Sequence, residues 1–197
     1  MLSRLLPIAE RASRVAVWAG GTLLIFSAAM VSVDVILRKL FSITLAGSDE
    51  ISGYLFGIST AFAFSYALLH RANVRIDALY MHLPRRVRAA LDLFGLLLLG
   101  LFISILTWRA LLLVQDSYAF WSKSITPLQT PLAIPQTFWV FGLVLFLITL
   151  VLVIAVTAIA LFRGDLATVQ KVAGARTVDE EIEEETHATP GGGRGEG

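Results

Sequence analysis

The chain has 197 residues and a formal net charge of +1, and 56% of its residues are hydrophobic whereas only 16% are charged. Soluble domains carry about a quarter charged residues, so this composition excludes an ordinary soluble protein. The near-neutral charge argues against a nucleic-acid binder, which neutralises phosphates with a broad basic surface. The chain has no cysteine, which removes disulfides, thiol catalysis and thiolate metal sites.

Four apolar segments predict four membrane-spanning helices. Residues 15–33, 51–69 and 137–162 contain no Asp, Glu, Lys, Arg or His, and 93–114 is interrupted only by Arg109. Each approaches the roughly 20 residues that a helix needs to cross a hydrocarbon core about 30 Å thick. The first is too long for the apolar region of a typical signal peptide, so we expect it to be retained. The sequence therefore predicts an all-α membrane protein with transmembrane helices at about 15–37, 51–69, 89–114 and 136–162.

Basic residues between these segments predict the orientation. Lys and Arg accumulate on the cytoplasmic side because they translocate poorly. In chain order the five flanking segments carry three, two, five, one and three of them: Arg4, Arg11 and Arg14; Arg38 and Lys39; Arg71, Arg75, Arg85, Arg86 and Arg88; Lys123; Arg163, Lys171 and Arg176. The alternation predicts that both termini are cytoplasmic, and it makes the five-arginine loop a topology lock.

Composition divides the chain into two parts. Residues 1–163 form the predicted transmembrane domain. Residues 164–197 turn polar, then acidic, then glycine-rich, which is typical of a largely disordered cytoplasmic tail.

The loop at 122–138 contains three prolines, which oppose helix continuation and predict an ordered or extended external segment.

Asp34 is the strongest candidate for chemistry near the membrane. It lies at the outer end of the first predicted helix, with Arg38 four residues later on the same face. One interpretation is an ion-paired anchor that holds the helix end or docks a neighbour. The other is a proton or ion site, because ionisable residues within membranes are costly and are often functional. The sequence leaves both open and favours the anchor.

Catalytic and cofactor sites find no support in the sequence. The three histidines, His70, His82 and His187, lie in the arginine loop and the tail, not on the facing helices that a membrane haem site needs. No zinc-like spacing and no phosphate-binding glycine loop occurs. We therefore expect no enzyme activity, no cofactor and no metal.

The second predicted helix carries small residues at four-residue intervals: Gly53, Gly57, Ala61 and Ser65. Small residues at this spacing form a groove where another helix can approach closely. The groove could accept a helix of a partner or a helix of this chain itself.

Four sequence segments, taken together, resemble a known family. They are "DVILRKLF" (34–41), "GSDEISGYLFGISTAFAFSYAL" (47–68), "NVRIDALYMHLP" (73–84) and "TPLAIPQTFWVFG" (130–142). Their order and spacing resemble the small integral-membrane subunit of TRAP (tripartite ATP-independent periplasmic) transporters, over about residues 10–163.

This resemblance implies a partnership in a bacterial or archaeal inner membrane. In that family a periplasmic binding protein captures an organic acid, and a large membrane subunit moves it inward with the sodium gradient. The small subunit packs against the large one as a scaffold. The expected partners are therefore a large TRAP membrane subunit, a periplasmic substrate-binding protein and membrane phospholipid, with no nucleic acid.

A few positions match the family pattern. Arg38 matches the basic residue after the first helix, Asp49 and Glu50 the acidic pair before the second, and Arg75 and Asp77 the charged positions that follow it. We expect these residues to lie at a subunit interface or to anchor the chain to lipid. The chain departs from the family where a tryptophan often precedes the acidic pair, and where Asn73 replaces a frequent histidine.

Two other functions remain possible from the sequence. The chain could be a self-sufficient small transporter that uses Asp34 as its coupling carboxylate. It could also be a membrane-anchored adaptor whose acidic run, 179–185, recruits a basic partner. A solvated, disordered tail is the simpler interpretation of that run.

Overall fold

The structure, a computed structural model, describes residues 5–71 and 83–174. These residues form five α-helices: α1 (Leu6–Phe41), α2 (Ser48–Leu69), α4 (Arg85–Ala119), α5 (Ala133–Phe162) and α6 (Leu166–Ala173). By length and composition α1, α2, α4 and α5 can each cross a membrane. The predicted all-α fold with four transmembrane helices is confirmed.

The first helix is longer than its apolar run predicts. α1 has 36 residues, which at 1.5 Å per residue is about 54 Å and well beyond a hydrocarbon core of about 30 Å. Its first turns lie outside the apolar segment and carry an ion pair between Glu10 and Arg14 at 2.9 Å. It ends where Ser42 adopts a left-handed conformation, φ 54°. Hydropathy therefore marks the membrane-crossing part, whereas local backbone geometry marks the helix end.

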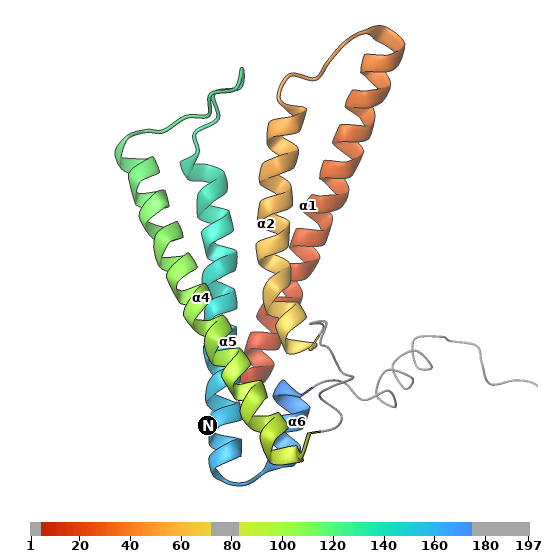
Figure 1. Ribbon diagram of the computed structural model, residues 1–197. Coiled ribbons are helices and arrows are strands. Elements are labelled where there is room, and N and C mark those ends of the chain that lie inside the picture. The colour runs from red at the N-terminus through yellow and green to blue at the C-terminus, as the bar shows by residue number, and fades with distance from the viewer. Residues whose placement is uncertain (1–4, 72–82, 175–197) are drawn as a thin grey trace, which may run out of the picture.

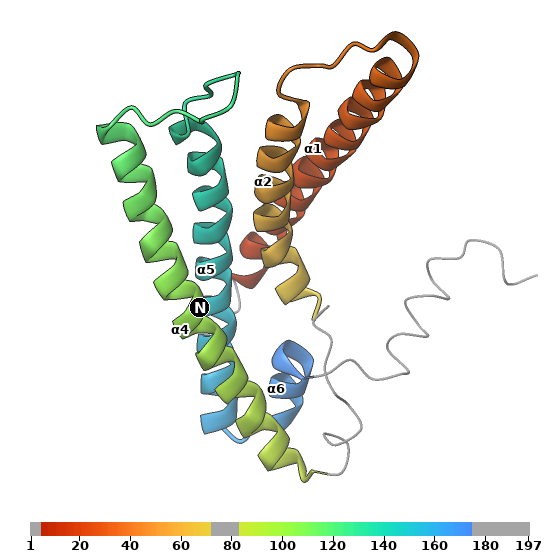
Figure 2. The same ribbon diagram turned by 45° about the horizontal axis from the view of Figure 1, so that its top comes forward.

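The four long helices form a row. α1 packs on α2, α2 on α5, and α5 on α4, so that α1 and α4 lie at opposite edges (Figures 1 and 2). The α1–α2 pair leans away from the α4–α5 pair toward the end that carries the two connecting segments 42–47 and 120–132. We call this the loop end, and the opposite end, where α6 lies, the α6 end. A row leaves both of its broad faces open to lipid or to a partner.

Small residues set the helix contacts within the row. A Cβ atom added to Gly142 of α5 would lie 2.8 Å from the Cβ of Ala61 and 2.8 Å from Cδ1 of Phe62 on α2. A Cβ added to Gly20 of α1 would lie 3.0 Å from the carbonyl oxygen of Ser59. In lipid, helices associate through such close packing because no hydrophobic driving force acts between them.

α6 closes the end opposite the loops and lies within the segment that the sequence assigned to the tail. It folds back against α4 and α5, where Val169 is buried beside Ala89 and Ala160. Ala173 is buried in a separate apolar cluster that includes Leu68 and Leu96. The chain thus keeps packing for about ten residues beyond the end of α5. Residues 175–197, including the acidic run, lie outside the described part.

Asp165 caps the N-terminus of α6. The Thr168 hydroxyl donates to its Oδ2 at 2.6 Å, and the Thr168 backbone N–H donates to its Oδ1 at 3.1 Å. These hydrogen bonds hold the pKa of Asp165 below its ordinary 3.8, and the one from the Thr168 hydroxyl has the largest effect. The ionised carboxylate therefore stabilises α6 above pH 3.8, and this stabilisation is lost as pH falls through the lowered pKa.

We expect Asp165→Ala to speed amide hydrogen exchange in α6 several-fold at neutral pH, because the cap is lost. Asp165→Asn is the matched control, since its amide oxygen can still cap but does not titrate. Exchange measured above and below the lowered pKa, and corrected for the intrinsic rate, should depend on pH in the wild type and not in the Asn variant. Equal pH dependence in both would contradict the assignment.

Candidate functional site

Asp34 is a buried carboxylate that holds the first loop onto α1. Its side chain lies at the loop end and is 2% exposed. Arg38 donates from Nη2 to Oδ2 at 2.5 Å, and the backbone N–H of Leu45 donates to Oδ1 at 2.6 Å. Both carboxylate oxygens are thus used within the chain. This geometry is that of a structural bracket between the end of α1 and the loop that leads to α2.

The acidic pair at the start of α2 divides into two different environments. Asp49 is exposed, whereas Glu50 is half-buried and accepts the hydroxyl of Tyr54 at 2.9 Å. The Thr126 hydroxyl also donates to Glu50, from the loop between α4 and α5, and Ser124 pairs with Thr126. Glu50 therefore ties the first turn of α2 to a loop 76 residues further along the chain.

Gly47 supports the same link between the two loops. It precedes α2 with φ +89°, a conformation that residues with a Cβ rarely adopt. An added Cβ would also meet Leu128, whose Cδ1 would lie only 1.7 Å away. Leu128 thus occupies the space that a side chain at position 47 would need. This contact connects the α1–α2 loop to the α4–α5 loop.

The small-residue groove on α2 is only partly filled by this chain. Ala61 and Ser65 are fully buried, and Ala61 receives Gly142 of α5. An added Cβ on Gly53 or Gly57 would meet nothing within 4 Å. The half of the groove toward the α6 end therefore serves internal packing, and the half toward the loop end is open.

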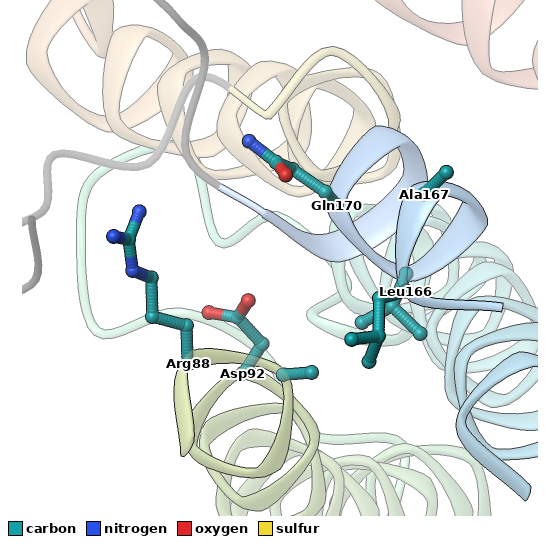
Figure 3. A pocket seen from close by; sticks show the side chains of 7 residues that line it. Arg88, Asp92, Leu166, Ala167 and Gln170 are labelled. Atoms are coloured by element: carbon teal, nitrogen blue, oxygen red, sulfur yellow. The ribbon is translucent and has the colours of Figure 1, made fainter. Parts of the chain in front are cut away.

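A polar cavity of about 180 Å³ lies at the α6 end between α4 and α6 (Figure 3). Arg88 and Asp92 line it from α4, and Gln170 lines it from α6. Arg71 bridges to the same helix by donating to the carbonyl oxygen of Gln170 at 3.3 Å. Two arginines of the five-arginine loop thus lie beside α6.

Of the predicted interface residues, Arg75 and Asp77 lie outside the described part of the chain.

Several residues of these contacts are not among the site residues predicted from the sequence. Thr126 and Leu128 lie in a proline-rich loop where no periodic pattern marks a contact, so nothing in the sequence pairs them with Glu50 and Gly47. For α6 a signal did exist: Gly164 follows the apolar run, and Asp165 is a typical N-cap residue.

Comparison with known proteins gives one family match. The model of the family described as "Tripartite ATP-independent periplasmic transporters, DctQ component" matches residues 27–164, well over half of the chain. Comparison with curated proteins and with solved structures gave no match. The matched range starts within α1 and ends just after α5, so it covers most of the transmembrane part and the contacts at the loop end.

Proposed function

Because this chain belongs to the DctQ component family of the TRAP transporters, and is thus a small multi-pass subunit of an inner-membrane transporter, we propose that it is the scaffold on which the transport subunit assembles. The family is a transporter component rather than an enzyme family. In this proposal the chain packs against a large membrane subunit, which works with a periplasmic binding protein to import an organic acid, with sodium as the coupling ion.

The observation that carries the proposal is the row of helices, whose two broad faces are left uncovered by residues 5–71 and 83–174. α4 contacts only α5 among the long helices, and α1 contacts mainly α2 with a smaller contact to α5, so the large apolar side chains of both helices are widely exposed. Leu101, Phe102 and Trp108 of α4, for example, are each more than half exposed. A row of this kind offers a long apolar surface along which another membrane protein can pack.

The state of Asp34 disfavours the alternative of a self-sufficient transporter. A coupling carboxylate has to exchange a proton or an ion during each cycle. Asp34 instead is buried with Arg38 on one oxygen and the Leu45 N–H on the other, so releasing it would free the α1–α2 loop. A structural role for this residue suits a scaffold.

The charges at the two ends support the proposed orientation. The arginines that lie toward the α6 end among the described residues include Arg11, Arg14, Arg71, Arg86, Arg88 and Arg163. The loop end carries Arg38, Lys39 and Lys123, with Arg109 in the half of α4 nearer that end. The positive-inside rule then places the α6 end in the cytoplasm. The loop end, with its Glu50–Thr126 link, would face the periplasmic binding protein.

Co-purification from the native host tests the proposal. With a tag on this chain and extraction in mild detergent, we expect a large polytopic membrane protein in near-stoichiometric amount. Reconstituted vesicles should transport an organic acid only when both membrane subunits and the binding protein are present. Transport by this chain alone, as a homo-oligomer, would overturn the scaffold proposal and favour the self-sufficient transporter.

A further inference from the structure

An apolar groove of about 650 Å³ lies between α2 and α5 toward the loop end. Its walls include Ile51, Leu55 and Phe62 of α2, Phe138 and Phe141 of α5, and Leu23 of α1. Its lining residues belong to both helix pairs, and these pairs diverge toward the loop end (Figure 2). The groove is therefore a consequence of how the two helix pairs diverge.

The groove has a closed inner end and a length that suits one leaflet. The rings of Phe62 and Phe141 meet edge to face there, with centroids 6.1 Å apart, next to the close contact of Gly142 with Ala61. From Ile51 to Phe62 the helix rises about 16 Å at 1.5 Å per residue. That is about half of a hydrocarbon core about 30 Å thick.

Polarity changes along the groove in the order found in a phospholipid. The mouth lies beside Glu50 and its partners Tyr54 and Thr126. Lys123 belongs to the neighbouring α4–α5 loop. Its backbone forms an isolated antiparallel β-bridge with Pro131, the residue that follows the groove-lining Thr130. Charges of both signs near the mouth suit a zwitterionic headgroup, and the carbon-lined interior suits a hydrocarbon tail.

Other occupants fit this space less well. An apolar cavity of this kind does not attract water, which needs two to four polar partners. A partner helix with its side chains is at least about 10 Å wide, so it needs a wider groove than one acyl chain does. An acyl chain is thinner and is present all around a protein in the membrane.

We propose that this groove holds one acyl chain of a zwitterionic phospholipid from the leaflet at the loop end. The acyl chain fills the space between the two helix pairs, so that Ile51, Leu55 and Phe138 contact the hydrocarbon of one retained lipid. This binding site lies within the small subunit and does not depend on its role as a scaffold.

The test uses a zwitterionic phosphatidylcholine with a diazirine in the middle of its acyl chain. The full-length chain, together with any large subunit that co-purifies, is reconstituted with this lipid, washed with detergent, irradiated and mapped by mass spectrometry. We expect adducts near Leu55 and Phe138 to survive the wash. Adducts near Leu98, a half-exposed residue of α4, should fall several-fold.

Matched variants separate the groove from the general lipid surface. Leu55→Phe should lower the groove adducts several-fold by filling the space, whereas Leu98→Phe should not change them. Phe138→Trp, at a position that is already half exposed, provides a second filling variant if Leu55→Phe does not fold. Unlabelled phosphatidylethanolamine should compete with the labelled lipid better than phosphatidylglycerol does.

Three results would overturn the proposal. Equal loss of adducts at Leu55 and Leu98 would mean that only annular lipid is present. Adducts in the isolated chain that vanish in the complex would mean that a partner covers the groove. Stronger competition by phosphatidylglycerol would contradict the zwitterionic headgroup. Recovery of the large subunit in the same samples reports on the scaffold function separately.

Discussion

Replacing Gly142 by leucine is expected to force α2 and α5 apart and to lower the stability of the helix row. The new Cβ alone would lie 2.8 Å from the Cβ of Ala61 and 3.0 Å from its backbone carbonyl carbon, which cannot move as a flexible side chain can. Overpacking of this kind costs about 1–3 kcal/mol. Thermal unfolding in detergent, followed by size-exclusion chromatography, should show a midpoint several degrees below that of the wild type.

Gly95→Leu provides the control for this experiment. Gly95 lies on α4, and a Cβ added there would meet nothing within 4 Å. The same change in size and helix propensity should therefore leave the midpoint near the wild-type value. If both variants unfolded at the same temperature, the Gly142–Ala61 contact would not be what holds the two helix pairs together.

Asp34→Asn is expected to leave transport by the assembled complex close to wild type, whereas Asp34→Leu should sharply reduce the yield of assembled complex. The asparagine oxygen can still accept the Leu45 N–H, so the loop stays attached although the ion pair with Arg38 is lost. Leucine keeps neither interaction and leaves the Arg38 guanidinium and the Leu45 amide without this partner.

Measuring uptake and subunit recovery in the same preparations distinguishes the two roles of Asp34. A bracket predicts that transport and assembly fall together in the leucine variant and persist together in the asparagine variant. A coupling carboxylate predicts normal assembly with lost transport in Asp34→Asn. Normal assembly with lost transport in Asp34→Asn would favour a self-sufficient transporter, or a coupling role for Asp34 within the complex.

The sequence alone determined the number of membrane spans. Each apolar run must form its own backbone hydrogen bonds in lipid, so a run of about 20 residues specifies a helix whatever its neighbours are. The order of short motifs likewise identified the family, which the match over residues 27–164 confirms. Helix ends were less predictable, because α1 and α4 continue as helices outside the apolar segment.

Only the tertiary structure decided which surfaces meet. Hydropathy is a property of one helix, and it is nearly the same on every side of these spans, so it does not reveal that the helices form a row. The four small residues of α2 look equivalent in sequence, yet Ala61 meets Gly142 whereas a Cβ added to Gly53 would meet nothing within 4 Å. The groove exists because helix pairs that touch at one level diverge toward the loops, and the contact between Glu50 and Thr126 joins the two pairs across that gap. That angle depends on the sum of many side-chain contacts between distant segments, which no local pattern records.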